Sequence, residues 1–167
     1  MACAAAAILA VPIPARLRAV PRRIRVLTVD SQPLVQEGLA AMINREDDMT
    51  VVATASTGAE ALDDVRRYRP DVVTLDLVLP DMRGETLVRQ ILAESPQTRI
   101  VAITSAWSHV HARRAVDAGI HGYLSKAAPV CELVHAIRQV RAGERIIPGP
   151  VPVQAAGCRL EEAQWKQ

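Results

Sequence analysis

Four polar side chains follow apolar runs in this sequence, each at the point where its run ends. They are Asp30 after 25–29, Asp76 after 72–75, Thr104 after 100–103 and Lys126 after 122–125. The carboxyl ends of parallel strands meet at one edge of an open sheet, and ligands bind in the crevice there. Two carboxylates, a hydroxyl and an ammonium at such an edge could hold a divalent metal ion and a phosphoryl group.

The elements that must place these side chains alternate along the chain. Apolar runs predict strands at 24–29, 50–55, 71–76, 99–104 and 121–125, and apolar residues at three-to-four spacing predict helices at 33–43, 59–67, 85–93, 109–118 and 130–141. Pro33 and Thr57 with Glu60 are helix-start signals, and Gly119 and Gly143 are stop signals. This alternation predicts an α/β fold with a doubly wound, five-stranded parallel sheet and helices on both faces.

Composition narrows the function classes. Half of the 167 residues are apolar and Phe is absent, so Val, Leu, Ile and Ala must build the core. The net charge is only +2, and residues 1–23 carry four Arg and no acid, which leaves 16 basic against 18 acidic residues for the rest. A mildly acidic body suits a metal-binding crevice better than a nucleic-acid backbone. Three widely spaced cysteines, Cys3, Cys131 and Cys158, favour reduced thiols and a cytoplasmic protein.

The two ends of the chain differ from the middle. The apolar stretch 1–11 lacks the basic amino-terminal region of a secretory signal. Pro12 and Pro14 follow it, and it is too short to span a bilayer as a helix. We expect 1–23 to be a disordered or mis-called N-terminal extension, 24–148 to be the domain, and 149–167 to be a short C-terminal tail. No membrane association is expected.

Residues 24–148 resemble a bacterial response-regulator receiver domain, which has a flavodoxin-like fold. The resemblance is carried by Arg25-Val-Leu-Thr-Val-Asp30, Pro70-Asp-Val-Val-Thr-Leu-Asp76-Leu-Val-Leu-Pro80-Asp-Met-Arg-Gly84, Thr104 and Ala118-Gly-Ile-His-Gly-Tyr-Leu-Ser-Lys126. The Gly-Tyr-Leu-Ser-Lys ending and Arg141-Ala-Gly-Glu144 are similar to the NarL/FixJ subfamily. In that subfamily a LuxR-type helix-turn-helix domain usually follows, and no such two-helix pattern is recognisable after Pro148.

The resemblance implies that Asp76 accepts a phosphoryl group from a histidine kinase, in a signalling module that is not a turnover enzyme. Asp30, Asp76 and the backbone carbonyl of Val78 would hold Mg²⁺. Lys126 and Thr104 would contact phosphoryl oxygens. Thr104 would then move toward the phosphoryl group, and Tyr123 would swing inward into the space that it leaves.

One position departs from the family. Receivers carry two adjacent acids after the first strand, whereas here Ser31 follows Asp30. A neutral hydroxyl is a poorer ligand than a carboxylate, so the sequence predicts a weakened Mg²⁺ site.

Three alternatives remain open from the sequence. The chain could be a receiver-fold module that dimerises or docks through its last two helices without phosphorylation, or a truncated DNA-binding transcription regulator. A small nucleotide-binding or hydrolytic enzyme is the third, although neither a glycine-rich phosphate loop nor a nucleophile elbow occurs. In either signalling alternative this chain itself has no specific DNA binding, and a homodimer is one expected assembly.

Overall fold

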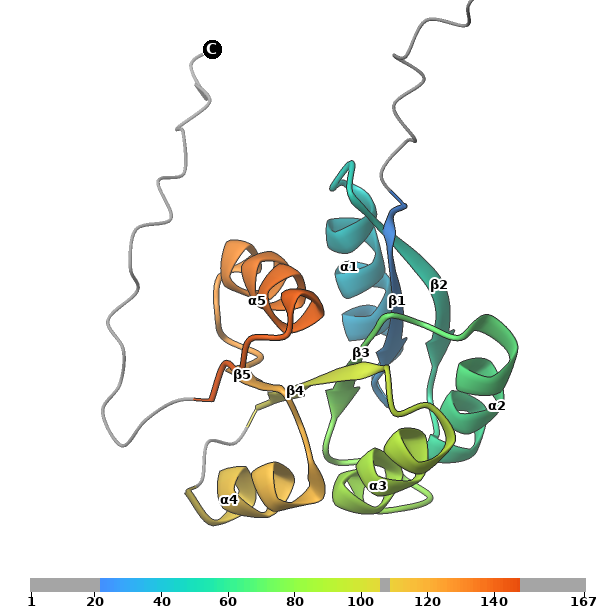
Figure 1. The fold of residues 1–167 in the computed structure, drawn as a ribbon, viewed down its shortest axis with the longest axis vertical. Coiled ribbons are helices and arrows are strands. Elements are labelled where there is room, and N and C mark those ends of the chain that lie inside the picture. Colours follow the sequence, from blue (N-terminus) through green and yellow to red (C-terminus); the bar gives the residue numbers. More distant parts are fainter. Residues whose placement is uncertain (1–21, 106–108, 148–167) are drawn as a thin grey trace, which may run out of the picture.

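A computed structural model describes residues 22–105 and 109–147, in which strands and helices alternate (Figure 1). The strands are β1 (Ile24–Val29), β2 (Met49–Ala55), β3 (Val72–Asp76), β4 (Arg99–Thr104) and β5 (Gly122–Ser125). The helices are α1 (Pro33–Asn44), α2 (Gly58–Tyr68), α3 (Gly84–Glu94), α4 (His109–Ala118) and α5 (Val130–Ala142). Each predicted element is present, with ends within one residue of the prediction.

The strands form one parallel sheet in the order β2-β1-β3-β4-β5. The chain order reverses at β1, because β2 lies on one side of it and β3 on the other. In open α/β sheets the crevice at such a reversal is the usual ligand site. The predicted flavodoxin-like doubly wound fold is therefore confirmed. At the reversal, Asp30 directly follows β1 and Asp76 is the last residue of β3.

Helices cover both faces of the sheet (Figure 1). On one face, α1 and α5 pack on a cluster that includes Val26, Val72 and Ile137. On the other, α2, α3 and α4 pack on a larger cluster that includes Leu27 and Leu75. Adjacent residues of β1 and β3 point to opposite clusters, as the alternation of side chains along a strand requires. Burial on both faces explains why these strands are continuous apolar runs.

Local signals account for the helix ends. Pro33 opens α1, where its missing N–H costs no intrahelical hydrogen bond. Thr57 caps α2 by accepting from the Glu60 N–H at 3.2 Å, and the Glu60 carboxylate accepts from the Ser56 N–H at 2.7 Å. Gly143 ends α5 in the left-handed region at φ 97°.

The described residues do not test the prediction of reduced thiols. Cys131 lies in the first turn of α5. Cys3 and Cys158 lie outside the described residues. The expectations for 1–21 and 148–167 lie outside them too, and in the described part of the chain no helix is long and apolar enough to cross a membrane.

Candidate functional site

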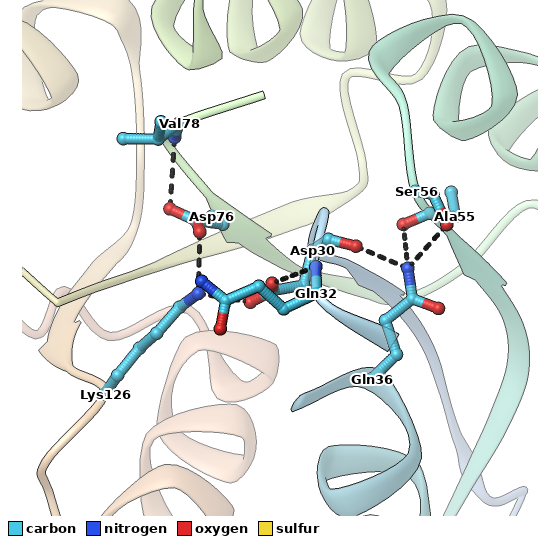
Figure 2. A network of polar contacts seen from close by, with 8 residues as sticks. All are labelled: Asp30, Gln32, Gln36, Ala55, Ser56, Asp76, Val78 and Lys126. Carbon is cyan, nitrogen blue, oxygen red and sulfur yellow. Dashed lines mark hydrogen bonds and ion pairs between the residues drawn. The ribbon is translucent and has the colours of Figure 1, made fainter. Parts of the chain in front are cut away.

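Two buried carboxylates lie side by side at the carboxyl end of the sheet (Figure 2). Asp30 is 1% exposed and Asp76 is 6% exposed. One oxygen of each is held by a backbone N–H two residues later: Gln32 N–H donates to Asp30 Oδ1 at 2.9 Å, and Val78 N–H donates to Asp76 Oδ1 at 3.0 Å. These bonds fix both carboxylates and leave both Oδ2 atoms for a cation.

Lys126 supplies that cation. Its Nζ lies 2.5 Å from Asp30 Oδ2 and 2.6 Å from Asp76 Oδ2 (Figure 2). The Lys126 N–H donates to the Thr104 carbonyl at 2.8 Å, so β4 positions the residue that follows β5. Burial by itself would lower the pKa of Lys126, but the hydrogen bonds to Asp30 and Asp76 outweigh it and raise the pKa. The ammonium is therefore charged at neutral pH and joins the two acids.

Thr104 ends β4, next to the strand that carries Asp76. It is 5% exposed, and its neighbour Ile103 is paired in register with Asp76. Tyr123 on β5 is fully buried. Burial raises the pKa of the Tyr123 hydroxyl, and hydrogen bonding with Thr104 opposes that effect. The tyrosine expected to swing inward is thus already inside in this structure, in contact with the threonine whose movement was expected to make space for it.

The other two positions singled out in the sequence lie at the rim. Ser31 is exposed, and the Val78 side chain is 72% exposed while its N–H holds Asp76. Within residues 22–105 and 109–147, no three residues among His, Cys, Asp and Glu are placed to hold a metal ion. The weakening of an Mg²⁺ site by Ser31 stays a prediction.

Gln36 is a site residue that the sequence did not indicate. It is 8% exposed on α1, and its amide nitrogen donates to the carbonyls of Asp30 and Ala55 and to the Ser56 hydroxyl (Figure 2). These contacts tie α1 to the ends of β1 and β2. The only available signal was its place one turn after Pro33, on the helix that follows Asp30.

Asp81 is a second residue that was missed. Although exposed, its two carboxylate oxygens accept from the N–H groups of Gly58 and Ala59 at 2.9 and 3.0 Å. The hydrogen bond from the Gly58 N–H is the largest cause that lowers the pKa of Asp81; burial opposes it, and the bond from the Ala59 N–H adds to the lowering. The loop after Asp76 is therefore attached to the amino end of α2.

Comparison with known proteins identifies the family of this chain. The sequence model of one protein family, the response regulator receiver domain, matches residues 26–138 of this chain. The chain belongs to this family. Receiver domains are the modules of two-component systems that receive phosphoryl groups from histidine kinases, and they are generally non-catalytic.

Two response regulators are similar to this chain in sequence. The chain is 38% identical to the response regulator GacA of Pseudomonas viridiflava over 80% of its own length and 62% of that protein. It is 30% identical to the response regulator protein VraR of Staphylococcus aureus over 84% of its length and 68% of that protein. It thus spans about three-fifths of the length of GacA.

Two solved structures of response regulators have the same fold. A LuxR-family two-component response regulator from Aurantimonas is 35% identical, with a TM-score of 0.71 over 74% of this chain and 89% of that chain. The receiver domain of the putative response regulator NarL from Mycobacterium tuberculosis is 28% identical, with a TM-score of 0.71 over 74% of this chain and all of the other.

Proposed function

We propose that Asp76 accepts a phosphoryl group from a histidine kinase, and that this chain is a two-component receiver with a weakened Mg²⁺ site. The observation that carries the proposal is the ammonium of Lys126 held against Asp30 and Asp76. A carboxylate attacking phosphorus needs the charge on the transferred group neutralised, and a fixed cation does this without reorganisation.

The surroundings favour Asp76 over Asp30 as the nucleophile. Both touch Lys126, but only Asp76 lies on a strand next to β4, which carries Thr104. Asp30 lies between β2 and β3 and accepts the Gln32 N–H beside the Gln36 amide. In the transfer, an Asp76 oxygen forms the new bond to phosphorus while the bond to the donor imidazole breaks, giving an acyl phosphate. Lys126 and the Thr104 hydroxyl then contact oxygens of the transferred group.

Mg²⁺ is the metal that the family implies. The buried oxygens of Asp30 and Asp76 fit a hard divalent cation, and the Val78 carbonyl is the proposed third protein ligand. When bound, the metal supplies additional positive charge to the phosphoryl oxygens. The affinity for Mg²⁺ rises with the number of anionic ligands, and Ser31 leaves two carboxylates where a third could stand. Lys126 also competes for the same oxygens.

In this proposal, phosphorylation of Asp76 changes the structure of the domain at Thr104 and Tyr123. Once Thr104 turns toward the phosphoryl group, its contact with the Tyr123 hydroxyl changes, and the packing of α4 and β5 around that ring is altered. The ring is already inside, so the expected signal is a change in its hydrogen bonding rather than entry of the ring.

The first test is covalent labelling. Incubation with acetyl phosphate and Mg²⁺ is expected to add one phosphoryl group per chain, seen by intact mass spectrometry. Of the two acids that contact Lys126 in the described residues, only Asp76 lies on the strand next to β4, which carries Thr104. Asp76→Asn is expected to remove the addition. Undiminished labelling of Asp76→Asn would contradict the assignment, whichever residue carried the group.

A receiver-fold module that works without phosphorylation is the second candidate. The observation in its favour is that Lys126 already pairs both carboxylates, so the site needs no metal to balance its charge. Such a module would dimerise or dock through α4 and α5. Failure of the wild-type chain to accept phosphoryl groups, together with a stable homodimer, would favour it.

Specific DNA binding is not expected of this chain itself. Apart from the four Arg in 1–23, acidic residues outnumber basic ones, and a short basic segment makes only a few phosphate contacts. Any gel shift should be weak and should weaken further as salt is raised, because binding through phosphate contacts is driven by counterion release. A salt-resistant shift on one defined sequence would support the truncated-regulator alternative instead.

Partner and location follow from the same proposal. A histidine kinase that uses ATP presents its phosphohistidine in the cytoplasm, so the chain is proposed to act there as a phosphoryl acceptor and not as a turnover enzyme.

A further inference from the structure

The loop that follows Asp76 is closed on itself. We call residues 77–83 the acceptor loop. Val78 and Arg83 form an antiparallel bridge across it, and the Gly84 N–H donates to the Leu77 carbonyl at 3.1 Å. A Cβ at position 84 would lie 2.6 Å from Leu77 Cα, so the two ends of the loop touch through backbone. The loop can therefore move as one piece.

An external contact holds this piece in place. Asp81, at its tip, accepts from the first two N–H groups of α2, those of Gly58 and Ala59. Met82 packs on the same helix start, where a Cβ at position 58 would lie 2.5 Å from its sulfur. A carboxylate at a helix N-terminus is favoured both by the free N–H groups and by the helix dipole. The contact joins segments that lie more than twenty residues apart in the sequence.

Helix α2 does not need Asp81 as its ordinary cap. Thr57 already accepts from Glu60, and Glu60 reaches back to the Ser56 N–H. Asp81 takes the two remaining N–H groups of the first turn, which that local cap leaves unused. Two caps with separate partners thus serve one helix end, and only one of them comes from the acceptor loop.

We propose that Asp81 is a positioning residue for phosphoryl transfer: by binding the amino end of α2 it fixes the acceptor loop, and through Val78 it fixes the Asp76 carboxylate. This inference deepens the proposed function and rests on it. The path is short, because the Val78 N–H is the donor that orients Asp76 Oδ1. The Val78 carbonyl, proposed as a metal ligand, belongs to the same closed loop.

The test compares two caps of one helix. Asp81→Ala removes the contact from the acceptor loop, and Thr57→Ala removes the local cap without touching that loop. Both variants are expected to lose thermal stability to a similar degree. Labelling of Asp76 by acetyl phosphate should slow on the order of ten-fold in Asp81→Ala, since small misplacements of reacting groups are costly, and stay within about two-fold in Thr57→Ala.

Asp81→Asn is the conservative variant. Its side chain offers one oxygen where Asp81 offers two, so one of the two N–H groups keeps its partner and the labelling rate should be intermediate. This variant also keeps the proposal testable if Asp81→Ala fails to fold. Equal slowing in the Asp81 and Thr57 variants would mean that α2 stability alone matters, and no slowing in the Asp81 variants would mean that the loop is fixed without it. Either result overturns the proposal.

Hydrogen exchange separates this proposal from the proposed function. The Gly84 N–H closes the acceptor loop, and it should exchange faster in Asp81→Ala than in Thr57→Ala, with no phosphoryl donor present. If the wild-type chain accepts no phosphoryl group, the proposed function fails and this exchange rate decides whether Asp81 fixes the loop. Equal exchange of Gly84 in the two variants would then refute the positioning role.

Discussion

Lys126→Met is expected to lower the free energy of unfolding of the metal-free protein by about 3 kcal/mol, because removing one partner of a buried ion pair leaves uncompensated charge. Here it leaves two carboxylates, 1% and 6% exposed, facing each other. Methionine keeps an unbranched apolar stem at this position, so most of the loss reports the missing ammonium. Urea denaturation in buffer that contains EDTA measures the change.

The loss should depend on metal and pH in defined ways. Mg²⁺ added to Lys126→Met should recover part of the stability, since a divalent cation can take the place of the ammonium between the carboxylates. In the wild type the pKa of Lys126 is raised in the folded state, so its contribution is complete below the ordinary value of 10.5 and is lost only as pH rises through the raised value. The difference between the two proteins should therefore be constant from pH 7 to pH 9.

Arg113→Met is the matched control for Lys126→Met. Its ion pair with Asp117 is exposed on α4, with side chains 80% and 56% accessible, so its removal should cost less than about 1 kcal/mol. Equal effects of the two substitutions would show that the contact of Lys126 with Asp30 and Asp76 contributes no more than a surface pair.

Ser31→Asp is expected to tighten Mg²⁺ binding by about ten-fold, equivalent to roughly 1.4 kcal/mol. Ser31 is exposed at the rim and directly follows Asp30, so a carboxylate there can approach a metal held by Asp30 and Asp76. A third anionic ligand raises the affinity for a hard cation, and it adds repulsion when no metal is bound. The variant should thus melt at a slightly lower temperature without metal, respond more strongly to Mg²⁺, and label faster at Asp76.

Ser31→Asn separates charge from size in that experiment. Asparagine offers an amide oxygen in the same position without the negative charge, so its Mg²⁺ affinity should stay close to that of the wild type. Mg²⁺ titrations followed by thermal shift compare the three proteins. Wild-type affinity as high as that of Ser31→Asp would mean that another ligand replaces the missing acid, and no binding by any of the three would favour the phosphorylation-independent alternative.

The positions of Asp30, Asp76, Thr104 and Lys126 could be predicted because each ends or directly follows a strand in a parallel sheet. Strand direction alone then brings their side chains to one edge. The bridging contact of Lys126 could not be predicted in the same way. The sequence indicated a lysine beside a phosphoryl oxygen, whereas the structure places its Nζ against two carboxylates at once. That contact depends on how far the Lys126 side chain extends from the end of β5 toward the ends of β3 and β1. The hydrophobic periodicity of the sequence carries no information about this.

Gln36 and Asp81 show the same limit at longer range. Thr57 was recognised as a cap because its partner Glu60 lies three residues away. Asp81 caps the same helix from a loop more than twenty residues later in the sequence. Gln36, on α1, donates to the hydroxyl of Ser56, which follows β2. A single polar residue in a loop or on a helix has no sequence pattern that names such a partner. Long-range polar contacts of this kind therefore become visible only in the folded structure.

Mapping the labelled residue tests the central claim most directly. After acetyl phosphate treatment, sodium borohydride reduces an acyl phosphate to the alcohol, so a phosphorylated aspartate becomes homoserine and can be located by peptide mass spectrometry. We predict homoserine at position 76, its dependence on Mg²⁺, and unmodified aspartate at position 30. Homoserine at position 30, or at neither position in a chain that is folded and saturated with Mg²⁺, would contradict the assignment of Asp76 as the phosphoryl acceptor.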